Sequence, residues 1–219
     1  MADSNAAYKL YNRLGSGGFA VKVALSIAGE PFELINLNST PGTELPASFR
    51  EINPWGQVPV LITPEGKLMT ESAAMLAFLA TRDKSGVLGP TVEQAEFAEL
   101  MRWLVFLSAN VYEAILRGGY PHRFTSDADA TDSVVTAARQ QAQRGFVLAD
   151  EQLQDRDYLI ANTFSVADVY VAMLYAWHHD TNACPNCRAL THRIAADPRI
   201  ASIWQKNFDH RLNVKWGRE

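Results

Sequence analysis

The first part of the chain alternates between strand-like and helix-like patterns of hydrophobic positions. Residues 8–12, "YKLYN", are typical of a short strand, and residues 19–29, "FAVKVALSIAG", place apolar side chains at helical spacing. This helix should end at Gly29, because glycine commonly follows a helix C-terminus. Residues 31–38, "PFELINLN", predict a second strand. A strand, a helix and a strand within about thirty residues predict a βαβ unit with two parallel strands.

A hairpin and a further helix follow. "VPVLI" (58–62) and "KLMT" (67–70) flank "TPEG", whose proline and glycine suit a turn, so these two strands should be antiparallel. "ESAAMLAFLATR" (71–82) predicts a helix directly after them. The order βαβ then ββα predicts a small mixed sheet with helices, in a first domain of residues 1–83.

Beyond residue 83 the pattern is helical throughout. Glycines and a proline mark a linker at 84–91, and residues 91–118 predict one long helix with a single apolar face. Further helices are predicted at 132–154, 165–177, 187–197 and 199–208. The expected fold class is therefore α/β plus all-α, with an all-helical second domain at 92–219.

Composition and charge narrow the class of protein. The chain has 219 residues, 47% hydrophobic and 20% charged, with a formal net charge of −4. This is ordinary globular composition, and the charge argues against a nucleic-acid partner. No apolar run is long enough to span a membrane, and the N-terminus lacks the order of a signal peptide. With only Cys184 and Cys187 there is no disulfide framework, so a cytoplasmic protein without a membrane partner is expected.

Pro59 lies inside the apolar run that predicts the third strand. Proline removes a ladder donor and is normally kept to strand starts, edges or bulges. Pro59 therefore either opens the strand with an ordinary trans bond, or marks a special backbone geometry.

Four segments, in this order, resemble the cytosolic glutathione transferases over almost the whole chain. They are "LYNRLGSGGFAVKVAL" (10–25), "INPWGQVPVL" (52–61), "TESAAML" (70–76) and "SVADVYVAML" (165–174). The resemblance implies a thioredoxin-like N-terminal domain followed by a helical domain. It also implies glutathione as co-substrate, no metal, and a homodimer.

The resemblance implies that the Val58–Pro59 bond is cis. The main chain of Val58 would then pair, like an added strand, with the cysteinyl part of an extended glutathione. Gln57, just before it, is a weaker candidate for the same ligand main chain.

Glu71 and Ser72 stand where the hairpin ends and the next helix begins. A helix N-terminus binds carboxylates through its free N–H groups and partial positive charge. The resemblance implies that Ser72 holds the γ-glutamyl carboxylate and that Glu71 meets the α-ammonium group. The alternative is that both are ordinary helix-start residues, because acidic and hydroxyl side chains favour that position.

The residue that activates the thiol is sought in the loop "LYNRLGSGGF". A free thiol has a pKa near 8.5, so the protein must stabilise the thiolate with a hydrogen bond or dipole. The loop has no cysteine, which disfavours the cysteine-dependent classes of the family. Ser16 is its only loop hydroxyl, and Tyr11 offers another at the strand end. We rank Ser16 above Tyr11, with the N–H groups of Gly17 and Gly18 as further donors.

The resemblance places an electrophile pocket between this loop and the long helix of the second domain, with Tyr112, Arg117 and Tyr120 as candidate lining residues. An arginine there would suit a carboxylate-bearing substrate.

Ser165 and Asp168 form an S-x-x-D box that caps a helix.

The histidines and cysteines near the C-terminus lack the spacing of a zinc site, so no metal is expected. The residues concerned are His178, His179, Cys184, Cys187 and His192.

The leading hypothesis is a glutathione S-transferase that activates the thiol for attack on a small apolar electrophile. The alternatives are another glutathione-dependent reaction at the same site (isomerase, dehalogenase, etherase or peroxidase) and a non-catalytic, protein-binding member of the family.

Overall fold

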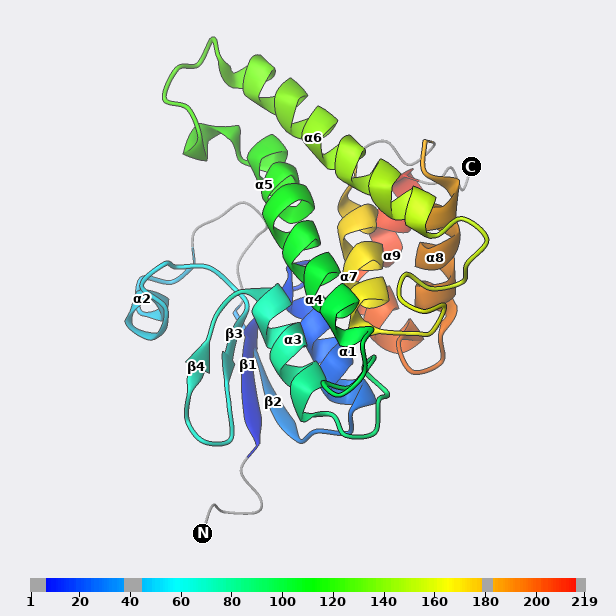
Figure 1. The fold of residues 1–219 in the computed structure, drawn as a ribbon. Coiled ribbons are helices and arrows are strands. Elements are labelled where there is room, and N and C mark those ends of the chain that lie inside the picture. Colours follow the sequence, from blue (N-terminus) through cyan, green and yellow to red (C-terminus); the bar gives the residue numbers. More distant parts are fainter. Residues whose placement is uncertain (1–6, 38–44, 179–182, 216–219) are drawn as a thin grey trace.

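A computed structural model describes residues 7–37, 45–178 and 183–215. The protein consists of a small sheet with its helices and a larger helical part (Figure 1). The sheet has the strand order β2-β1-β3-β4. β1 (Tyr8–Asn12) runs parallel to β2 (Phe32–Asn36) and antiparallel to β3 (Val60–Ile62), which pairs with β4 (Leu68–Met69). The predicted βαβ and ββα units are therefore confirmed.

The two faces of the sheet carry different partners. Along β1, Tyr8 and Leu10 are buried in the main core with α1 (Gly18–Ile27) and α3 (Ser72–Arg82). Successive side chains of a strand alternate between the faces, so Tyr11 points the other way. Its ring lies 6.0 Å from that of Phe49 in α2, a short helix (Phe49–Ile52) that the sequence pattern did not predict.

The long helix predicted at 91–118 is shorter and divided. Residues 91–96 form turns whose main-chain bonds span three residues, since the Gln94 N–H donates to the Thr91 carbonyl at 3.0 Å and the Phe97 N–H donates to the Gln94 carbonyl at 3.1 Å. The segment then comprises α4 (Phe97–Phe106), the π-helical turn η1 (Leu107–Tyr112) and α5 (Glu113–Gly119). The prediction of a continuous helix from residue 91 was therefore wrong.

The short 3₁₀ turn η2 (Pro121–Arg123) was not predicted. The remaining helices follow the predicted order and are α6 (Thr131–Gln152), α7 (Val166–Trp177), α8 (Pro185–Ala196) and α9 (Ala201–Lys215). In Figure 1, α7 runs between α1 of the sheet domain and the outer helices α6, α8 and α9. None of the helices in the described ranges is long and apolar enough to cross a bilayer.

The start of α7 is fixed by a buried carboxylate. Asp168 accepts the Ser165 N–H at 2.7 Å, the Ser165 hydroxyl at 2.9 Å and the Leu159 N–H at 2.7 Å. The predicted capping box is present, and it also ties in the loop before the helix. Burial raises the pKa of the Asp168 carboxyl to about 6, although these hydrogen bonds oppose the shift.

Asp168→Asn should destabilise the fold by about 1–3 kcal/mol, because the amide turns an N–H₂ group toward buried donors that need an acceptor. Urea unfolding at neutral pH measures this loss. Glu93→Gln, which neutralises an exposed acid, is the matched control and should leave the midpoint unchanged.

The difference in stability between the unmodified and Asp168→Asn proteins should also depend on pH. The folded pKa of about 6 lies above the ordinary value near 4, so the folded state binds an extra proton between these limits. The proton that the folded state binds should therefore add stability that is full below about pH 4 and is lost as pH rises through 6, while the hydrogen bonds that Asp168 accepts stabilise the fold on both sides of this range. If the Asp168→Asn protein showed the same fall in stability between these pH values, the fall could not be assigned to this carboxyl.

Candidate active site

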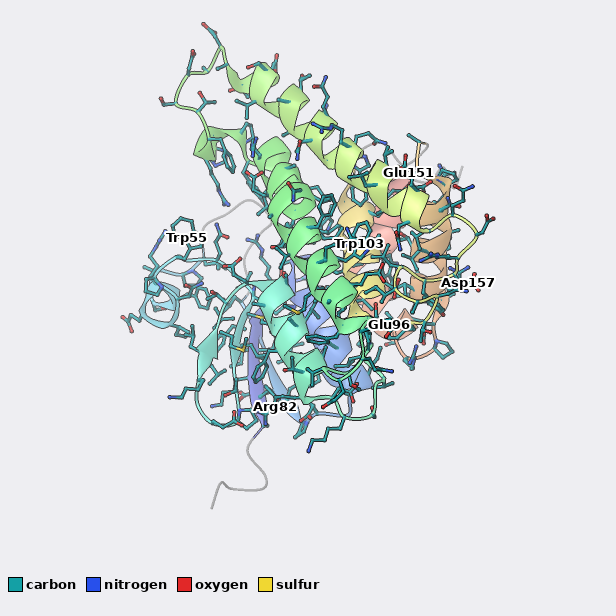
Figure 2. The ribbon with its side chains drawn as sticks, in the orientation of Figure 1. Trp55, Arg82, Glu96, Trp103, Glu151 and Asp157 are labelled. Carbon is teal, nitrogen blue, oxygen red and sulfur yellow. The ribbon has the colours of Figure 1, made fainter. Side chains whose placement is uncertain are left out.

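A cavity of about 810 Å³ lies between the sheet domain and the helical domain. One wall comes from the loop after β1, from α2 and from the segment leading into β3, and the opposite wall comes from η1, α5, η2 and the end of α7. Its size is that of a small-molecule binding site. Trp55 lines this cavity and is 72% exposed. Figure 2 shows it near α2.

Ser16 lines the cavity and is paired with a buried asparagine. Its hydroxyl donates to Asn12 Oδ1 at 2.8 Å, and the Gly18 N–H points at the same hydroxyl oxygen at 3.4 Å. Asn12 is the last residue of β1 and is 2% exposed. Sequence reasoning missed Asn12, although a polar residue at an inward-facing position of a strand was a signal for it.

Glycine is required at position 18. A Cβ there would lie 2.1 Å from Asn12 Oδ1, and Asn12 cannot move without releasing Ser16. The two glycines after Ser16 thus allow α1 to begin directly against the site.

Gly17 makes an equally close approach, to the helical domain. A Cβ at Gly17 would lie 2.5 Å from the hydroxyl oxygen of Tyr112, so the main chain of Gly17 lies directly against that oxygen. Burial, followed by the nearby Tyr170 hydroxyl and Glu71 carboxylate, raises the pKa of Tyr112. The phenol therefore keeps its proton at neutral pH.

The Val58–Pro59 bond is cis, as predicted. Val58 is half-buried and lines the cavity, as does the exposed Gln57, whose carbonyl accepts a bond from Asn53 Nδ2 at 2.8 Å. Among the described residues, no hydrogen bond uses the Val58 N–H or carbonyl. Both groups remain available to pair with an extended ligand.

Glu71 and Ser72 lie at the start of α3, close to this site but outside the cavity lining. Glu71 has φ 63° and ψ 105°, an uncommon conformation for a residue other than glycine, and such residues cluster at functional sites. Ser72 is buried, and its hydroxyl lies 3.1 Å from the Tyr170 hydroxyl. Its side chain is therefore already engaged, which leaves the helix N–H groups as the available donors.

Two predicted site residues lie elsewhere. Tyr11 faces Phe49 on the other side of the sheet, and it is not among the residues lining the cavity. Arg117 is ion-paired with Glu113 and stacks over Phe124 at 5.6 Å. The reason is helical rotation, since the cavity-facing side of α5 is formed by positions 115, 116 and 119.

Arginine is nevertheless present in the cavity, at positions not predicted. Tyr120 lines it as expected, and the Arg123 guanidinium stacks on the Tyr120 ring at 4.2 Å. Arg13 and Arg50 line the opposite wall, and no carboxylate is among the described lining residues. The cavity therefore has a positive electrostatic character.

The C-terminal cysteines and histidines form a packing cluster. Cys184 and Cys187 are buried free thiols, and burial raises the pKa of Cys187. His178 Nε2 lies 2.6 Å from Gln143 Oε1, while His179 lies outside the described residues. Over the described ranges, no three such side chains converge in a way that could hold a metal ion.

Comparisons with known proteins agree with this geometry. Family models for the N-terminal and C-terminal domains of glutathione S-transferase match residues 19–82 and 114–196, together about two thirds of the chain. The chain therefore belongs to the glutathione S-transferase family of enzymes.

The relatives and structures that it resembles cover nearly the whole chain. It is 26% identical to glutathione S-transferase GST-4.5 of Xanthomonas campestris, over 90% of this chain and 97% of that protein. It is 25% identical to the uncharacterized GST-like protein YncG of Escherichia coli, over 91% and 98%. A sphingomonad glutathione S-transferase complexed with glutathione superposes with a TM-score of 0.75 at 26% identity, over 90% and 97%.

Gly18→Ala should cost about 1–3 kcal/mol of stability, because the added methyl overpacks the site and displaces Asn12. It should also lower any thiol-transfer rate, since Ser16 would lose its partner. Gly119→Ala is the matched control for stability, because a Cβ there meets nothing within 4 Å. Equal midpoints in thermal unfolding for the two variants would contradict the close contact.

Proposed function

We propose that this protein binds glutathione along the Val58 main chain and activates its thiol for attack on an aromatic, anionic electrophile. The observation that carries the proposal is that the Val58 N–H and carbonyl, beside the cis bond, have no hydrogen-bond partner among the described residues, while Val58 lines the same cavity as Ser16. The glutathione complex of the sphingomonad relative supports the choice of tripeptide.

In the proposed complex, the cysteinyl residue of glutathione pairs with Val58 as a short added strand. Its γ-glutamyl end reaches the start of α3, where the first N–H groups hold the carboxylate and Glu71 meets the ammonium group. Gln57 flanks the same main chain. The glycyl carboxylate then points toward α2, where Arg50 and Trp55 line the cavity.

Thiol activation in this proposal depends on Ser16. The serine hydroxyl donates to the Asn12 oxygen. A half-turn of the Asn12 amide would present its N–H₂ group instead and release the serine proton to the sulfur. The N-terminus of α1, which begins at Gly18, adds a favourable dipole for the thiolate.

The electrophile would occupy the helical wall of the cavity. Ile115, Leu116, Tyr120 and Trp177 offer an apolar, aromatic surface there, and Arg123 supplies a positive charge at its edge. The thiolate attacks the electrophilic carbon, a C–S bond forms, and the leaving group departs with the electron pair. Isomerase, dehalogenase, etherase and peroxidase reactions would begin from the same thiolate.

Two further expectations accompany the proposal. The family resemblance predicts a homodimer, which analytical ultracentrifugation of the purified protein would test. A cytoplasmic location also remains a prediction, and cell fractionation would test it.

Ser16→Ala should raise the pKa of the bound glutathione thiol by about one unit, because one hydrogen bond to the thiolate is worth roughly 1–3 kcal/mol. Thiolate ultraviolet absorbance across pH measures the shift. Tyr11→Phe is the comparison and should leave this pKa unchanged, since the tyrosine faces Phe49. A shift in the Tyr11 variant alone would assign activation to the tyrosine.

Arg123→Gln should raise KM roughly fivefold for chlorodinitrobenzoate and leave KM for the uncharged chlorodinitrobenzene unchanged, since only the carboxylate can pair with the guanidinium. Arg117→Gln is the matched control, because Arg117 is paired with Glu113 outside the cavity. Equal effects of Arg123→Gln on both substrates would remove the anionic class from the proposal.

A further inference from the structure

The space that a side chain at position 17 would fill is occupied by a residue of the other domain. Beside the hydroxyl oxygen, the Cε1 and Cζ atoms of the Tyr112 ring lie 3.3 Å from the position of a Gly17 Cβ. Gly17 has φ −58° and ψ −16°, which any residue can adopt. The presence of Tyr112, rather than backbone strain, is therefore what excludes a side chain from position 17.

The Tyr112 hydroxyl has a proton to donate. The Gly17 N–H beside its oxygen is a donor and lowers the pKa of the phenol, so it offers no acceptor and the Tyr112 O–H points elsewhere. The neighbouring Tyr170 hydroxyl is engaged with Ser72, and no hydrogen bond among the described residues takes the Tyr112 proton. Tyr112 also lines the cavity. This O–H is thus positioned as a donor to a ligand in the cavity.

The tyrosine is held rigidly in this place. Its ring packs edge-on against Tyr170 at 6.2 Å and, tilted, against Trp177 at 5.4 Å. It is the last residue of the π-helical turn η1, and such turns are frequent at functional sites. A fixed donor costs little reorganisation when charge develops on an acceptor.

Ser16 and Tyr112 line the same cavity from the two domains, and the Tyr112 hydroxyl lies against Gly17, the residue that follows Ser16. We propose that Tyr112 is a second thiol-activating donor, whose O–H replaces the missing side chain at position 17 and bonds the glutathione sulfur. This inference rests on the proposed glutathione site. It changes Tyr112 from a pocket-lining residue into a catalytic one.

Tyr112→Phe tests the proposal, because it keeps the ring contacts and removes only the hydroxyl. The bound thiol pKa, followed by thiolate absorbance, should rise by about one unit, which leaves roughly tenfold less thiolate below that pKa. The calorimetric Kd for glutathione should change less than about threefold, because the tripeptide is held elsewhere. Tyr158→Phe, on a half-buried tyrosine of the segment between α6 and α7, is the control.

A rescue separates donation from packing. With the Tyr112 hydroxyl gone, Gly17→Ser can place a hydroxyl in the vacated space. The Tyr112→Phe/Gly17→Ser protein should regain part of the lost pKa shift, whereas Tyr112→Phe/Gly17→Ala should not. Gly17→Ala alone should also raise the thiol pKa, because its methyl displaces the tyrosine oxygen, so the test does not depend on one variant folding.

The outcomes distinguish the two proposals. Glutathione binding by the unmodified protein, with an unchanged thiol pKa in Tyr112→Phe, would overturn the role of Tyr112 and leave the proposed function intact. Equal pKa values in the serine and alanine double variants would also overturn it. Failure of the unmodified protein to bind millimolar glutathione would overturn both proposals.

Discussion

The close approach of the loop after β1 to the helical domain is the constraint on which the site depends. At Gly17, main chain from the sheet domain lies so close to the Tyr112 hydroxyl of η1 that a Cβ would come within 2.5 Å of its oxygen. The same loop is held from a third direction by α9, where the Gly15 N–H donates to the buried Asn207 side chain at 3.2 Å. The relative placement of the two domains therefore determines which groups reach a thiol bound beside Ser16.

The charge distribution supports the same chemistry. Arg13, Arg50 and Arg123 line the cavity, and α1 begins at its edge with the positive end of its dipole. A positive potential stabilises a thiolate relative to a thiol and also attracts an anionic electrophile. The aromatic rings on the helical wall provide the apolar surface that the carbon skeleton of such a substrate needs.

Much of the fold could be predicted from local patterns. Strand and helix periodicity located the strands of the described sheet and most helices, and the S-x-x-D box located the start of α7. The errors in the predicted secondary structure fall on segments whose conformation is set by tertiary contacts. The four-residue helix α2 is too short to show a period, and the π-helical turn inside the long helix leaves no sign in an apolar pattern.

The site was predicted in part for the same reason. Local motifs that resemble the family predicted Ser16 and Val58 as site residues, and both line the cavity, while their roles stay predictions. Arg117 and Arg123 cannot be told apart by residue type: the rotation of α5 turns Arg117 to Glu113, whereas η2 brings Arg123 to the cavity. The partners of Gly17 and Ser16, which are Tyr112 and Asn12, are visible only once the chain is folded.

A crystal structure with bound glutathione tests the central claim most directly. We expect both main-chain groups of Val58 to lie within hydrogen-bond distance of the cysteinyl residue, and the sulfur to lie within reach of the Ser16 and Tyr112 hydroxyls. Glutathione bound elsewhere, or with its sulfur turned away from both hydroxyls, would contradict the account.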